Sequence, residues 1–205
     1  IESKQTVQDL LKYLPKYRYY AFTKNNNSAV GLAVISKFPI IKTKKINISS
    51  NKKFTRPIQK VTLDINHLEF IIFNNHWRSK RASESQRIEY ALSLQNYIKS
   101  LPKNSDYILI GDFNSNYNEF QTFKNDKKLN DTYNNTGINQ VLNPTINEKF
   151  ITKNSILTFN KKVHYNLWIE LNYHDRYSYK FKGINNTPDN IILNQALFDN
   201  KNISY

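Results

Sequence analysis

Apolar positions along the chain change between helical and extended spacing. Val7, Leu10, Leu11 and Leu14 follow the spacing of one helix face, and Pro15 ends that segment. A second helix is expected from Ser83, where Ser83 and Gln86 have the spacing of a capping box, to Leu101-Pro102. Short runs rich in aromatic and β-branched residues predict strands at 17–22, 31–36, 61–65, 68–73, 107–110, 165–168, 177–181 and 191–193. This alternation of helices and buried strands predicts an α/β fold.

One strand runs directly into a polar tetrapeptide. The apolar run 107–110 is followed by Gly111-Asp112-Phe113-Asn114. If the chain stays extended, Asp112 and Asn114 lie on one side and Phe113 points into the core, because side chains alternate along a strand. A carboxylate beside a carboxamide can hold a hydrated divalent cation or a phosphoryl oxygen. The alternative is a plain turn, since Gly, Asp and Asn are the commonest turn residues.

A histidine follows the preceding strand. Asn74-Asn75-His76 comes directly after the run 68–73, and the basic residues Arg78, Lys80 and Arg81 lie shortly beyond. A histidine in this place can act as a general acid or base beside phosphate-binding cations. The alternative is a surface loop that contains a histidine by chance. The order strand, loop, helix, strand predicts that His76 and Asp112 leave the carboxyl ends of neighbouring strands.

Two further polar pairs flank buried segments. Asp189-Asn190 stands at the entrance of the strand 191–193, and Arg56-Pro57 precedes the strand 61–65. The first pair is also compatible with a simple Pro-Asp-Asn turn.

Composition narrows the class of protein. The 205 residues can bury the core of one domain, and 30 Lys and Arg against 16 Asp and Glu give a formal net charge of +14. This excess favours nucleic acid as a partner, although a sequence crowded with Lys, Asn and Ile can be basic through compositional drift. The absence of Cys excludes disulfides, thiolate metal sites and a cysteine nucleophile. No apolar run reaches the length of a membrane span.

The polar motifs form an ordered set: Arg56-Pro57, Asn75-His76, Gly111-Asp112-Phe113-Asn114 and Asp189-Asn190-Ile191-Ile192. As a set they resemble the endonuclease/exonuclease/phosphatase superfamily, the pancreatic deoxyribonuclease-like proteins, over nearly the whole chain. The run 75–80 is most similar to secreted bacterial nucleases. The resemblance implies a single domain over 1–205 with a four-layer α/β/β/α sandwich of two packed mixed β-sheets. It also implies divalent-metal-dependent hydrolysis of phosphate esters.

The resemblance further implies a role for each matched residue. Asp112 matches the acid that orients or deprotonates the attacking water, and Asn114 matches the amide that stabilises the phosphoryl oxygens. Both are the implied metal contacts, for Mg²⁺ or else Mn²⁺ or Ca²⁺. His76 matches the first of two histidines at the scissile phosphate, and Asp189 matches an acid near the metal. The other implied phosphate or substrate contacts are Arg56, Asn75, Arg78, Lys80 and Asn190.

The chain departs from the family pattern near both ends. The family's metal-binding Glu has no match, because Ile1-Glu2 runs directly into the first helix and Glu2 is a poor substitute by register. No Asp-His pair follows Asp189. We therefore expect a chain that lacks its first strand, the metal Glu, the second histidine and the last strand.

The function expected from these observations is a monomeric, exported, metal-dependent nuclease of low sequence specificity that acts on DNA rather than RNA. Two alternatives stay open. One is a sphingomyelinase- or inositol-phosphatase-like phosphohydrolase, against which the basic run after His76 argues. The other is a catalytically incomplete member of the family that binds nucleic acid, which the missing Glu and Asp-His motivate.

Overall fold

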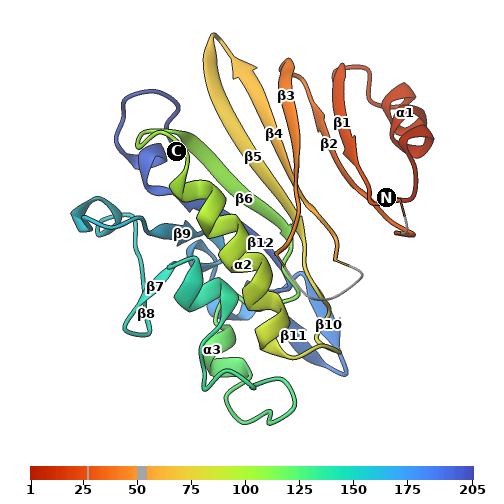
Figure 1. The fold of residues 1–205 in the computed structure, drawn as a ribbon. Coiled ribbons are helices and arrows are strands. Elements are labelled where there is room, and N and C mark those ends of the chain that lie inside the picture. The colour runs from red at the N-terminus through yellow and green to blue at the C-terminus, as the bar shows by residue number, and fades with distance from the viewer. Residues whose placement is uncertain (27, 50–54) are drawn as a thin grey trace.

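A six-stranded mixed sheet forms the centre of the protein (Figure 1). The structure is a computed structural model that describes residues 1–26, 28–49 and 55–205. Strands β5 and β6 are parallel, and the other neighbouring pairs of this sheet are antiparallel. In spatial order the strands are β3 (Ile40–Ile46), β4 (Ile58–Ile65), β5 (Leu68–His76), β6 (Asp106–Asp112), β12 (Asp189–Asn194) and β9 (His164–Asn166).

A tight turn joins β4 to β5. Asn66 and His67 both have positive φ, 54° and 69°, and His67 N donates a hydrogen bond to Asp64 Oδ1 at 2.7 Å. Two successive residues of positive φ are the geometry of a two-residue hairpin whose twist matches that of its strands. The two strands predicted at 61–65 and 68–73 therefore form a hairpin, and His67 is exposed in its turn.

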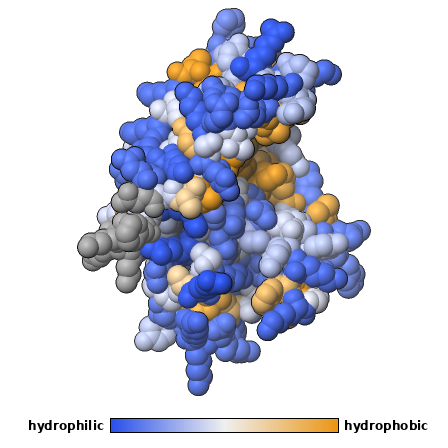
Figure 2. Space-filling model, turned by 90° about the vertical axis from the view of Figure 1, so that its right-hand side faces the viewer, coloured by the Kyte–Doolittle hydropathy of each residue, from blue (hydrophilic) through white to orange (hydrophobic). Residues whose placement is uncertain are grey.

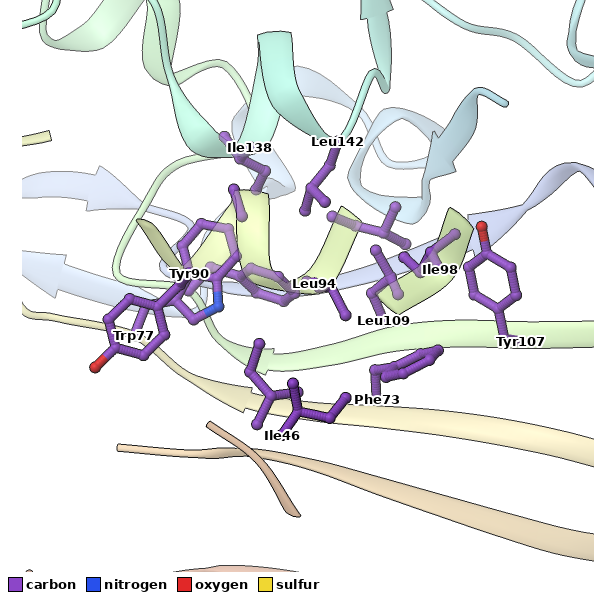
Figure 3. Close-up of a cluster of buried hydrophobic side chains, with 14 of the residues drawn as sticks. Ile46, Phe73, Trp77, Tyr90, Leu94, Ile98, Tyr107, Leu109, Ile138 and Leu142 are labelled. Atoms are coloured by element: carbon purple, nitrogen blue, oxygen red, sulfur yellow. The ribbon is translucent and has the colours of Figure 1, made fainter. Parts of the chain in front are cut away.

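Helix α2 (Glu84–Lys99) covers one face of the central sheet. Phe73 and Leu109 project from the sheet and meet Leu94 and Ile98 of the helix in one buried cluster (Figure 3). The π-helical turn η1 (Gly137–Val141) packs on the same helix. Trp77, directly after β5, is fully buried in this cluster, with its ring 4.8 Å from that of Phe113 and 6.1 Å from that of Tyr90.

The opposite face is covered by a second, two-stranded sheet of β1 (Tyr19–Thr23) and β2 (Leu32–Ser36). Ala21 and Val34 from these strands form a buried cluster with residues of β4 and β5. The neighbouring Tyr20 points the other way and accepts a hydrogen bond from Gln8 of helix α1 (Lys4–Lys12) at 3.1 Å. The layers are therefore α1, the two-stranded sheet, the central sheet and α2, which confirms the four-layer sandwich.

The second sheet leaves part of the central sheet uncovered. Ile191 of β12 is 46% exposed, and its cross-strand neighbour Ile110 is only half-buried. Figure 2 views the molecule from the side that carries α1 and shows apolar side chains gathered in a hollow of an otherwise largely hydrophilic surface.

Three local predictions need correction. Strand β3 was not expected, because its Lys- and Thr-rich sequence lies at the sheet edge with mostly exposed side chains. The segment 165–168 is only partly extended, since a 3₁₀ helix (Leu167–Glu170) begins within it. Ser83 makes no capping bond with its side chain; the first amides of α2 are satisfied instead by the Leu129 carbonyl and the Asp131 carboxylate.

The remaining elements are short and lie mainly between β6 and β12. They are α3 (Glu119–Thr122), β7 (Thr145–Ile146), β8 (Lys149–Phe150), β10 (Tyr179–Phe181), β11 (Ile184–Asn186) and 3₁₀ helices at Ile156–Thr158, Tyr173–Asp175 and Gln195–Phe198. The sequence also predicts polar loops at 24–27 and 47–53, and parts of both lie outside the described residues. Within the described ranges, no helix has the length and apolar character needed to cross a membrane.

Candidate active site

The predicted catalytic residues lie on three neighbouring strands, at the same end of the central sheet. In the parallel pair β5–β6, His76 lies opposite Asp112, and in the antiparallel pair β6–β12, Asp189 lies opposite Asp112. His76 Nε2 is 3.5 Å from Asp112 Oδ2, and both side chains are about one-third exposed, at 29% and 35%. The predicted convergence of the two loops at neighbouring strand ends is confirmed.

The segment after Asp112 is a turn and not an extended chain. Asn114 has a φ of 49°, and its backbone N donates to Asp112 Oδ1 at 2.8 Å. Phe113 still points into the core, where it is fully buried. Asn114 Nδ2 donates to the Trp77 carbonyl at 3.2 Å, so its side chain is held beside the loop that follows His76. Both interpretations of the sequence are therefore correct in part: the turn forms, and it positions polar groups at the site.

Arg56 is fixed beside this pair. Its Nη1 donates to the same Trp77 carbonyl at 3.1 Å, and its backbone N donates to the buried Tyr90 hydroxyl at 3.1 Å. The Trp77 carbonyl thus joins Arg56 and Asn114, two residues that sequence analysis identified separately. A partly buried guanidinium in this place offers a permanent positive charge to a phosphate group.

The environment shifts the proton affinities of the two central groups. Burial, together with the positive charge of Arg56, lowers the pKa of His76 to about 4. Burial raises the pKa of Asp112, the Asn114 backbone hydrogen bond opposes this, and the negative charge of Asp189 raises it further. At neutral pH the imidazole of His76 is therefore uncharged, and its 3.5 Å contact with Asp112 is a polar contact without an ion pair.

Asp189 is exposed at the start of β12. Ser178 Oγ donates to its Oδ2 at 2.7 Å, and its backbone carbonyl accepts a bond from Trp168 Nε1 at 2.7 Å. Sequence analysis missed Ser178, because a serine between two tyrosines carries no signal of its own. The hydroxyl of Ser178 therefore binds only one of the two carboxylate oxygens of Asp189.

Asn75 and Asn190 lie inside the protein. Asn75 is 1% exposed; its Nδ2 donates to the carbonyls of Phe73 and Ile110, and its Oδ1 accepts from Trp77 Nε1. Asn190 is 2% exposed. Its Nδ2 donates to the carbonyls of Ser115 and Thr187, and its Oδ1 accepts from Asn166 Nδ2. Both residues brace the loops of the site. Direct contact with a substrate would require these hydrogen bonds to open.

Two of the three basic residues after His76, Lys80 and Arg78, have different surroundings. Lys80 Nζ forms a 2.9 Å ion pair with the buried Glu119, whose carboxylate also accepts a bond from Asn116 N. Arg78 and Arg56 line the same pocket.

This basic pocket has a volume of about 580 Å³. Three of its lining side chains are cationic, and among the described lining residues none is acidic. Sequence analysis missed Lys45, because it is one of several lysines in the unpredicted strand β3, and Asn25, because it lies in a loop. The lining residues are Asn25, Asn26, Ser28, Ala29, Lys45, Thr55, Arg56, Arg78, Ser79 and Tyr90.

The site offers oxygen ligands to a divalent cation that takes only one or two of its ligands from the protein. Among residues 1–26, 28–49 and 55–205, no cluster of three or more His, Asp or Glu side chains is placed to hold a metal ion. Asp112 and Asn114 nevertheless offer oxygen ligands, and the like charge of Asp189 beside Asp112 is a repulsion that a cation would relieve. Mg²⁺ typically uses one or two carboxylates and completes its shell with water and phosphate oxygens. The residues present fit such an ion.

A four-layer sandwich that gathers a histidine, an arginine and two aspartates at neighbouring strand ends offers the kinds of group that hydrolysis of a phosphate ester requires. The family model of the Endonuclease/Exonuclease/phosphatase family matches residues 2–183. The chain belongs to this family, whose members are metal-dependent phosphoesterases that include nucleases and phosphatases. A search of the curated proteins found no match.

Solved structures support the fold. A humanized form of TDP2 from D. rerio superposes with a TM-score of 0.60 at 14% identity, over 93% of this chain and 66% of that one. D. rerio TDP2 complexed with a single-strand DNA product gives 0.59 at 13% identity, over 93% and 67%. The mannosyl-6-phosphatase Bt3783 of Bacteroides thetaiotaomicron gives 0.57 at 17% identity, over 93% and 67%. The chain thus spans about two-thirds of the length of these relatives.

Proposed function

We propose that this protein is a metal-dependent nuclease that cuts DNA with little sequence preference. The observation that carries the proposal is the basic pocket lined by Arg56, whose positive charge also acts on His76 and Asp112. A small phosphomonoester needs one phosphate site, whereas a polynucleotide presents further phosphates on either side of the scissile bond. Lys45 and Arg78 offer charge where such a neighbouring phosphate would lie, and phosphate contacts dominate non-specific binding of nucleic acid.

The geometry supports a role for each of these residues. Arg56, fixed by the Trp77 carbonyl, would bind an oxygen of the scissile phosphate, and Asn114, held by the same carbonyl, would orient a second oxygen. Neutral His76 would exchange a proton with the reacting oxygen beside Asp112. Asp112 and Asn114 would hold the cation, and Mg²⁺ in that place neutralises charge on the phosphoryl oxygens.

Two relatives support different substrates. The D. rerio TDP2 structure contains a single-strand DNA product, and the Bacteroides thetaiotaomicron relative is a mannosyl-6-phosphatase. The net charge of +14 and the acid-free pocket favour nucleic acid for this chain, and DNA before RNA by the resemblance to secreted nucleases. The same resemblance supports our further proposals that the protein acts as a monomer, forms one domain over 1–205 and is exported.

The test is nicking of supercoiled plasmid in Mg²⁺, with and without chelator. We expect chelator-sensitive nicking that falls by about 100-fold or more in His76→Asn, the usual effect of removing an acid–base group. His67→Asn is the matched control, because His67 is exposed in the β4–β5 turn and Asn accepts its positive φ.

A second variant tests the pocket. Lys45→Gln should raise KM for DNA and leave hydrolysis of the small diester bis(p-nitrophenyl) phosphate unchanged. DNA left intact with Mg²⁺, Mn²⁺ and Ca²⁺ would refute the nuclease proposal. Hydrolysis of sphingomyelin or an inositol phosphate would then identify the phosphohydrolase alternative, and tight DNA binding without cleavage the non-catalytic one.

A further inference from the structure

The hairpin of β10 and β11 exposes an apolar face that the fold does not use. Tyr179, Phe181 and Ile184 are 54%, 53% and 67% exposed, and none of them belongs to a core cluster. Tyr179 and Phe181 are two residues apart on one strand, and Ile184 is the cross-strand partner of Phe181, so the three share one face. Single exposed apolar residues are ordinary, but a contiguous apolar face on a protruding hairpin indicates a contact surface.

The two rings form a platform. They are stacked on each other, with centroids 6.3 Å apart and planes that differ by 20°, and a further flat ring can extend this stack. Lys182 Nζ lies 5.6 Å from the centre of the Phe181 ring. Lys182 and Gly183 make the turn of the hairpin with φ of 48° and 82°.

The hairpin is anchored to the active site at its base. Ser178, directly before β10, donates to the catalytic candidate Asp189 at 2.7 Å and bonds through its N to the Asn186 carbonyl. Asn186 Oδ1 accepts a bond from Asn116 in the loop after β6. Figure 1 shows the hairpin at the end of the central sheet where β5 and β6 terminate.

Arg176 holds the segment that enters the hairpin. Its guanidinium donates to the carbonyls of Leu171 and Ile169 and to the Tyr117 hydroxyl, and it lies over the Tyr117 ring at 5.2 Å. A two-stranded hairpin alone is only marginally stable in water. These contacts give the aromatic face a fixed position before any ligand arrives, which lowers the entropic cost of binding.

Charge identifies the chemistry of the ligand. The segment 176–188 contains three cationic residues and no carboxylate. Lys180 lies on the hairpin face opposite the rings, the face that Ser178 shares by strand alternation. Aromatic rings beside the Lys182 cation match a flexible polyanion that carries flat, stackable groups.

We infer that Tyr179 and Phe181 form a stacking platform for unpaired bases, so that the enzyme binds single-stranded nucleic acid beside its catalytic site. The inference rests on the proposed nuclease function. In a duplex the base faces are already stacked on their neighbours, and the rings can engage them only where pairing is absent. Base stacking on a protein ring contributes about 1–3 kcal/mol per base, and it tolerates any sequence.

The test compares binding of a fluorescent oligo-dT strand with binding of a short duplex, by anisotropy in chelator so that nothing is cut. Tyr179→Ala/Phe181→Ala should bind the single strand about 10-fold more weakly or worse, and the duplex within about twofold of the parent. Tyr13→Ala/Phe38→Ala is the control, because it removes one exposed Tyr and one exposed Phe from the other side of the protein. The swap Tyr179→Phe/Phe181→Tyr keeps both rings and should restore binding.

Equal losses for single strand and duplex, or no loss, would overturn the inference. Binding of the parent to phosphatidylcholine vesicles that the double alanine variant loses, with oligo-dT binding unchanged, would also overturn it and assign the hairpin to a lipid surface. Thermal melting of each variant confirms folding. If the platform binds oligo-dT as described but plasmid is never nicked in Mg²⁺, the nuclease proposal fails and the hairpin inference stands.

Discussion

Removing one member of the buried ion pair of Glu84 and Arg87 should be among the most destabilising single substitutions outside the apolar core. Both side chains are fully buried, and Arg87 Nε donates to Glu84 Oε2 at 2.7 Å. Glu84 Oε1 accepts from Gly137 N at 2.8 Å, and Arg87 Nη1 donates to the carbonyls of Ser79 and Ala82. The pair therefore joins α2 to η1 and to the basic loop after His76.

Removing one member leaves the other charge buried without its partner. Burial already raises the pKa of Glu84, and the charge of Arg87 opposes that rise. We expect Arg87→Met to lower the free energy of unfolding by about 3–5 kcal/mol, the usual cost of breaking a buried pair from one side. Glu84→Gln retains an acceptor for Gly137 N but strands the guanidinium, so its cost should be of similar size.

The double variant distinguishes charge from packing. Glu84→Gln/Arg87→Met buries no charge, and its loss should be at least about 2 kcal/mol smaller than the two single losses added together. Urea unfolding followed by the fluorescence of the buried Trp77 measures all three variants. Additive losses, or a loss below about 1 kcal/mol for either single variant, would refute the reasoning.

Two further predictions concern backbone and pH. Gly111→Ala places a Cβ 2.2 Å from the Asn75 carbonyl oxygen at a φ of +120°, so it should lower the free energy of unfolding in urea by at least about 3 kcal/mol. Gly183→Ala, at a φ of +82° in open space, should lower it by only about 1 kcal/mol. Similar losses for the two variants would contradict the clash at Gly111. Burial lowers the pKa of His164 from its ordinary value of 6.5 to about 4 in the folded protein. Between pH 6.5 and about 4 the unfolded chain therefore binds more protons at this residue than the folded protein does. Stability should therefore fall as pH decreases from about 6.5 to 4, by roughly 3 kcal/mol at about 1.4 kcal/mol per unit, and His164→Gln should flatten this slope; parallel profiles would contradict it.

Local patterns predicted the parts of the fold that local forces decide. The apolar runs of β4 and β5 and the helical spacing of apolar residues in α1 are each encoded within a few residues of one another. The parallel neighbours β5 and β6 followed from the short connection through α2. Hence the meeting of His76 with Asp112 was predictable.

What the sequence could not reveal depends on distant partners. Asn75 and Asn190 are typical surface or turn residues by composition, and only the carbonyls that surround them in the folded state make their burial favourable. Strand β3 has no apolar alternation, because as an edge strand it needs only a few contacts with the core. Ser178 and Lys45 join the site through residues far away in the chain.

The position of β12 in the central sheet determines when the site can exist. This strand is the last of the described chain, yet it lies between β6 and β9, and it alone supplies Asp189. During synthesis, β5, α2 and β6 leave the ribosome long before β12, so His76 and Asp112 can meet while Asp189 is still being made. The complete constellation forms only when β12 inserts beside β6. Completion of the site is therefore coupled to insertion of β12 into the sheet. A chain arrested before that step would expose the unpaired edge of β6.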